Sequence, residues 1–105
     1  MRALLREAIV SGARLVVPAG ALAQVWRDGA RQVPLRALVH GPTTVVAVFD
    51  QVLAEAAGTL CGRAGTSDVI DASVVLTARR ERAAVVTSDA GDLLRLDPTL
   101  TVHTV

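Results

Sequence analysis

Residues 65–96, GTSDVIDASVVLTARRERAAVVTSDAGDLLRL, contain the pattern that decides the fold. This stretch carries four of the chain's ten acidic residues: Asp68, Asp71, Asp89 and Asp92. Each of these acids stands where a helix is expected to begin. Helix starts and acidic side chains therefore coincide at two places along the stretch.

The first half of the stretch predicts a buried helix. Thr66 and Ser67 are favourable N-cap residues, and the mainly apolar run that follows them ends at residues 79–80. The expected helix is apolar on nearly every side, which is typical of a helix packed inside a core. Because Asp68 and Asp71 are three residues apart, both carboxylates are expected on one face of its first turn.

The second half predicts a strand that leads directly into a helix. Residues 84–87 form a short apolar run rich in β-branched side chains, which is typical of a buried parallel strand. Ser88 or Asp89 then caps a short helix, with Asp92 in a capping-box position. Open α/β sheets bind their ligands at the carboxyl ends of the strands, so Asp89 lies where a functional site is expected.

Acidic residues in a first helical turn also have an explanation without function. The helix dipole favours each of them by about 0.3–1 kcal/mol. For Asp71 and Asp92, capping or the dipole explains the position at least as well as a site does. For Asp68 and Asp89 we favour a site, because buried elements would otherwise bring charges toward the interior without compensation.

Composition excludes several classes of protein. A length of 105 residues fits a single domain over residues 1–105, and no apolar run approaches a membrane span, so we expect a soluble, cytoplasmic protein without membrane contact. The chain has no lysine, which excludes a P-loop and a phospho-receiver site. Cys61 is the sole cysteine and is expected to be a small buried side chain. The acids remain as the candidate chemistry.

Helical and strand signals alternate along the rest of the chain. The helix expected over residues 31–39 should face inward with Val33, Leu35 and Leu38. This alternation predicts an α/β fold, a mostly parallel sheet with helices on both faces. The other expected helices cover residues 1–10, 18–26 (stopped by Gly29), 31–39 and a run capped by Asp50 that ends near Gly62, and the other expected strands cover 15–17, 44–48 and 101–105.

The motifs TSDVIDA (residues 66–72) and VVTSD (residues 85–89) resemble the C-terminal half of a PIN domain, and most closely the VapC-type toxins of bacterial toxin–antitoxin pairs. The resemblance implies a three-layer α/β/α fold and a metal-dependent endoribonuclease whose acidic cluster holds Mg²⁺ or Mn²⁺. It also implies RNA as substrate and an antitoxin-like protein as partner. Hard divalent cations do prefer carboxylate oxygens, and a bound metal offsets charge on a phosphodiester.

Taken residue by residue, the resemblance gives Asp68 the place of the family's third acid and Asp89 that of its fourth. Asp71 and Asp92 are supporting acids and further metal ligands. Arginines on the helices could contact RNA phosphates, with a solvated helix surface as the favoured alternative for each. The candidates for substrate binding are Arg27 and Arg31.

The chain departs from the family pattern at two places. The second acid, usually a glutamate, falls on Gln24, and an amide is a poorer ligand for a hard cation. The first acid ends a strand that should precede the first helix, whereas the chain begins within that expected helix. We therefore expect a PIN-like domain truncated at its N-terminus, with the first strand absent.

Two alternatives remain open. A catalytically degenerate PIN-fold module could hold an antitoxin-like partner, or an unrelated α/β domain could use all four acids as helix caps. A sheet that lacks a central strand is also expected to be completed by assembly, so we expect a homodimer. The apolar surface expected at its interface comprises Leu4, Leu5, Ile9, Val25 and Trp26.

Overall fold

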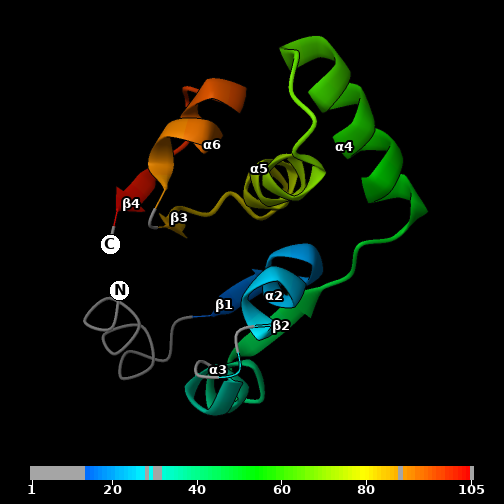
Figure 1. The fold of residues 1–105 in the computed structure, drawn as a ribbon. Coiled ribbons are helices and arrows are strands. Elements are labelled where there is room, and N and C mark those ends of the chain that lie inside the picture. Colours follow the sequence, from blue (N-terminus) through cyan, green and yellow to red (C-terminus); the bar gives the residue numbers. More distant parts are fainter. Residues whose placement is uncertain (1–13, 28, 30–31, 88, 105) are drawn as a thin grey trace. The chain divides into compact units, whose positions relative to one another are not determined.

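The computed structural model describes residues 14–27, 29, 32–87 and 89–104, which belong to two compact units (Figure 1). The first unit extends to Val48 and the second begins at Phe49. Each unit combines parallel strands with helices, so the predicted α/β class is confirmed. No helix in the described part of the chain is long and apolar enough to cross a membrane. The helix expected over residues 1–10 lies outside the described residues.

The first unit contains one pair of parallel strands. Strand β1 (Leu15–Pro18) pairs with β2 (Thr44–Ala47), in a register that places Leu15 opposite Thr44. Both strands were expected from the sequence. Pro18 was expected to be the first helical residue, but it ends β1 and serves as N-cap of α2 (Ala19–Trp26) with ψ at 132°. A proline φ near −61° suits both states, so the ring alone does not decide between them.

Helix α3 (Gln32–Val39) follows α2 in the first unit. Leu35 and Leu38 are half-buried, as expected, but Val33 is 81% exposed, so its predicted inward position is wrong. Helical spacing explains the difference, because Val33 shares its side of the helix with Arg36 and not with the leucines. That side forms a shallow surface hollow lined by Val33, Arg36, Ala37 and His40.

The second unit begins with α4 (Gln51–Ala64). Its predicted cap is confirmed, because Oδ1 of Asp50 accepts a hydrogen bond from the Leu53 N–H at 2.9 Å. The expected end near Gly62 is wrong by two residues. Gly65 adopts a φ of 72° as the C-cap, and its N–H donates to the carbonyl of Cys61. Glycine accepts this left-handed conformation without a Cβ clash, which makes Gly65 the natural stop.

Helix α5 (Val69–Glu81) is the buried helix expected from the sequence. Its buried side chains occur on several sides of the helix. The helix ends one residue later than expected, where Arg82 takes a left-handed conformation with φ at 52°. The buried residues are Ala72, Ser73, Val75, Thr77 and Ala78.

Strand β3 (Val85–Thr87), helix α6 (Ala90–Leu96) and strand β4 (Val102–Thr104) complete the second unit. The two strands are parallel, with Val85 opposite Val102. Val85 is buried as predicted, whereas Val86 is 39% exposed. In the described part of the chain, the strands pair as β1–β2 in the first unit and β3–β4 in the second.

Two hydrophobic clusters form the core of the second unit, and α5 contributes to both. One cluster joins α5 to β3 and α6, and the other joins α5 to α4. Cys61 is buried in the latter, as predicted. The buried members are Val75, Ala78, Val85 and Leu93 in the first cluster and Ala57, Cys61 and Ala72 in the second.

Candidate metal centre

The start of α5 positions the first pair of acids. Asp68 is the N-cap of this helix, and its Oδ1 accepts a hydrogen bond from the Asp71 N–H at 2.9 Å. The prediction that Thr66 or Ser67 caps the helix is therefore wrong. Thr66 instead accepts a hydrogen bond from the Asp68 N–H at 3.3 Å, which supports the turn that leads into the helix. Aspartate is as good an N-cap as serine, so propensity alone could not place the helix start.

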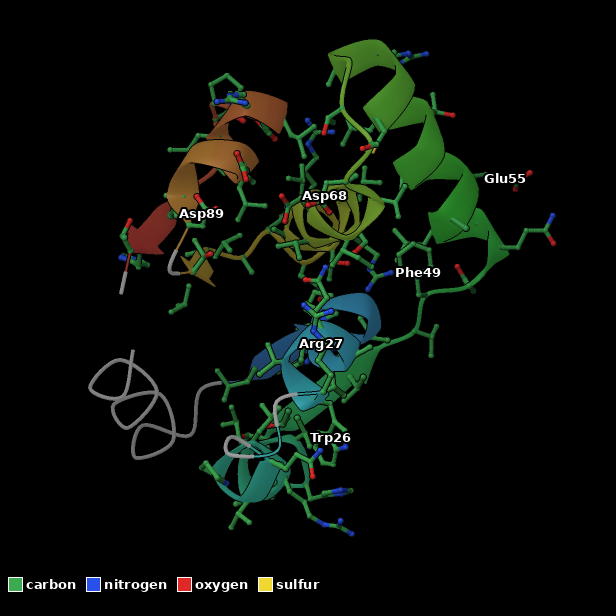
Figure 2. All side chains as sticks on the ribbon, viewed as in Figure 1. Trp26, Arg27, Phe49, Glu55, Asp68 and Asp89 are labelled. Atoms are coloured by element: carbon green, nitrogen blue, oxygen red, sulfur yellow. The ribbon has the colours of Figure 1, made fainter. Side chains whose placement is uncertain are left out.

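The turn between β3 and α6 positions the second pair. Asp89 is the N-cap of α6, and its N–H donates to Oγ1 of Thr87 at 3.1 Å. Its side chain makes no capping hydrogen bond, so the exposed carboxylate is not used by its own helix. Asp92 lies in the first turn of α6. Figure 2 shows the side chains of Asp68 and Asp89 at the two helix starts.

Electrostatic coupling connects the two pairs. The pKa of the Asp71 carboxyl is raised from 3.8 to about 6, first by burial and then by the charge of Asp68 and a hydrogen bond with it. The negative charges of Asp92 and Asp89 raise the pKa of Asp71 further. All four acids belong to the second unit, so two helix starts bring their charges to bear on one half-buried carboxyl group.

This donor set has the chemistry that a hard divalent cation prefers, because every candidate ligand is a carboxylate oxygen. A cation among the four acids would also offset the repulsion that raises the pKa of Asp71. In the described part of the chain, no three side chains of Asp, Glu, His or Cys are already arranged so that they could hold one metal ion.

The remaining predicted site residues belong to the first unit. Gln24 is exposed on α2, and Arg27 is the exposed residue that follows this helix. Arg31 lies outside the described residues, and so do Leu4, Leu5 and Ile9 of the expected dimer surface. Val25 of that surface is 36% exposed and Trp26 is half-buried.

One charged group escaped the sequence analysis. Asp97 was not among the predicted site residues, yet its side chain is only 7% exposed and its carboxylate pairs with Nε of Arg79 at 2.7 Å. Thr99 donates to it from both its N–H and its hydroxyl. The bonds from Thr99, followed by that from Arg79, lower the pKa of Asp97 to about 2. The Asp-Pro-Thr sequence signals the local turn, whereas the contact with Arg79, 18 residues away, has no local signal.

Comparison with known proteins adds no family to this description. No protein-family model, no curated protein and no solved structure matches the chain.

Proposed function

We propose that this chain is a metal-dependent endoribonuclease of the VapC toxin type. One observation carries the proposal: burial and the charges of three neighbouring acids from two helix starts, Asp68, Asp92 and Asp89, together raise the pKa of Asp71 to about 6. Like charges are costly to gather, and a polyanionic site of this kind is typical of proteins that bind Mg²⁺ or Mn²⁺. The resemblance of residues 66–72 and 85–89 to a PIN domain supplies the reaction class.

In this proposal Asp68 and Asp89 are the catalytic acids and the principal metal ligands. Neither carboxylate is covered, since both residues are exposed. Asp71 and Asp92 add charge from the adjacent helical turns and would serve as further ligands of the cation. When bound, the metal supplies positive charge that offsets the charge of the RNA phosphodiester and lowers the pKa of an attacking water. Contact of Arg27 and Arg31 with RNA phosphates stays a prediction from the sequence.

The second candidate function is a PIN-fold binding module that holds an antitoxin-like protein without cutting RNA. The observation that favours it is Gln24, which stands where the family carries an acid. A neutral amide weakens the attraction for a hard cation. The two candidates differ in one respect that can be measured, because only the nuclease couples metal binding to cleavage.

The test uses four forms of the full chain: the wild type, Asp68→Asn, Asp89→Asn and Glu55→Gln. Glu55 is an exposed acid on α4 of the same unit, so its variant controls for the loss of one negative charge (Figure 2). Calorimetric titration with MnCl₂ should detect binding to the wild type and to Glu55→Gln, and weaker or no binding to the two Asn variants. Equal binding to all four proteins would refute the metal site.

Cleavage is then measured on a fluorescently labelled single-stranded RNA pool with Mn²⁺, with and without EDTA. Cleavage that requires the metal and disappears in Asp68→Asn and Asp89→Asn would support the nuclease. Metal binding without cleavage would favour the binding module instead.

A further inference from the structure

Helix α6 brings two of the four acids to the candidate metal centre, yet little of this helix is buried. Of its seven residues, Leu93 is buried and Leu96 is partly buried. Leu93 belongs to the same hydrophobic cluster as Val75 of α5, and α6 lies beside that helix (Figure 1). Apolar contacts are not directional, so a short helix held mainly at one buried side chain can pivot about it. A second fixed point is needed to set the direction of α6.

Asp97 supplies a second fixed point at the end of α6. Its N–H donates to the Leu93 carbonyl at 3.0 Å, so Asp97 moves with the helix. Its Oδ2 accepts a hydrogen bond from Nε of Arg79, in the last turn of α5, at 2.7 Å. Its Oδ1 accepts hydrogen bonds from the N–H and the hydroxyl of Thr99. Because both carboxylate oxygens are engaged, the direction in which the carboxylate meets Arg79 is fixed.

This ion pair and the acids lie at opposite ends of the same two helices. Asp71 and Arg79 are eight residues apart on α5, which is about 12 Å along the helix axis. Asp92 lies in the first turn of α6, whereas Asp97 is its C-cap. The charges of Asp89 and Asp92 reach Asp71, so the starts of the two helices also lie near each other. A pivot of α6 about its buried side chain would therefore change the distance between the two acid pairs.

We propose that Arg79 and Asp97 are positioning residues, whose ion pair holds α6 against α5 and so sets the distance between the acid pair of α5 and that of α6. Neither residue binds the cation or the RNA. The inference rests on the proposed metal-dependent function, because it concerns the affinity of that metal centre. Groups that orient metal ligands without binding the metal typically contribute about 10–100-fold to the affinity.

Two neighbouring arginines provide a matched test. Arg80 lies in the same turn of α5 and pairs with Glu81 at 3.5 Å, so Arg80→Gln removes the same charge while the pair that it breaks lies within one helix. In calorimetric titration with MnCl₂, Arg79→Gln and Asp97→Asn should each raise the dissociation constant about tenfold, the lower end of that range. Arg80→Gln should keep the wild-type value. The double variant of Arg79 and Asp97 should bind no more weakly than either single variant, because both residues act through one contact.

Two further measurements separate positioning from stability. Ala54 is an exposed residue inside α4, and Ala54→Gly destabilises the same unit through helix propensity alone. This variant should bind Mn²⁺ with the wild-type affinity while it remains folded. Without metal, amide hydrogen exchange should show that the Asp97 N–H loses protection in Arg79→Gln and keeps it in Arg80→Gln, because local opening at the end of α6 becomes easier.

Equal Mn²⁺ affinity of Arg79→Gln and Arg80→Gln would overturn the proposal. Lost protection of the Asp97 N–H would not rescue it, since the ion pair would then stabilise α6 without positioning the acids. A wild type that binds no Mn²⁺ would refute the proposed metal site instead. The exchange measurement would then decide by itself whether the pair holds α6, and unchanged protection in Arg79→Gln would show that it does not.

Discussion

Replacing Asp97 with Asn should destabilise the second unit in a manner that depends on pH. The carboxylate of Asp97 connects the turn after α6 to Arg79 on α5, and its pKa is lowered from 3.8 to about 2. A shift of one unit corresponds to about 1.4 kcal/mol, which sets an upper limit of about 2.5 kcal/mol. Because the Arg79 side chain is 47% exposed, solvent screens the pair. We therefore expect the variant to lose about 1–2 kcal/mol.

The sign of the pH dependence follows from the direction of the pKa shift. A folded-state pKa below the unfolded value means that ionised Asp97 stabilises the fold above pH 3.8, and that this stabilisation disappears as the pH falls through about 2. The free energy of unfolding should be measured in urea by far-UV circular dichroism at pH 7 and at pH 2.5, with Glu55→Gln as control. The difference between wild type and Asp97→Asn should shrink at the lower pH. Equal stability at pH 7 would refute the assignment of Arg79 and Asp97 as a stabilising pair.

Three further predictions concern single residues. Asp71 keeps its proton in the folded state up to about pH 6, whereas the unfolded chain loses it near pH 3.8, so the free energy of unfolding should fall as the pH rises through this window. Asp71→Asn should remove that fall and, after solvent screening is allowed for, stabilise the chain at pH 7 by about 1 kcal/mol, as measured by urea unfolding. Gly65→Ala should cost about 1 kcal/mol of thermal stability, because φ is 72° there, whereas Gly62→Ala inside α4 should be neutral or stabilising. Gln24→Glu should tighten Mn²⁺ binding in calorimetry if α2 supplies a ligand to the acidic cluster, and unchanged affinity in a folded variant would exclude it from the site.

Local chemistry in the sequence predicted much of the fold. Asp50 marks the start of α4 because a capping aspartate before an apolar run is a strong signal. The strands of both sheets were predicted because short runs of β-branched residues are typical of strands. The misplaced boundaries arise where several residues carry similar propensities. Gly62 and Gly65 are equally plausible helix stops by type, and residue type alone does not show that Gly65 is the one that adopts a positive φ.

The candidate site was predictable in part. The sequence placed all four acids at helix starts, since acids in first turns are recognisable from neighbouring residues. It could not show that Asp71 is the half-buried member, because that depends on how α5 and α6 pack around it. The pairing of Arg79 with Asp97 was missed for a related reason, because it depends on which side of α5 meets a distant segment, and periodicity does not show what covers a helix face. The exposure of Val33 follows instead from helical spacing, which places it on the side of Arg36.

The coupling of the four carboxylates is the central claim, and the pKa of Asp71 tests it most directly. Carbon-13 NMR of the side-chain carboxyl groups over pH 3–8 should give Asp71 a pKa of about 6. This pKa should fall toward 3.8 in Asp68→Asn, which removes both a negative charge and a hydrogen bond, and should fall in the wild type when Mg²⁺ is added. An Asp71 pKa near 3.8 that responds to neither change would contradict the claim, because the acids would then be four independent helix-start residues.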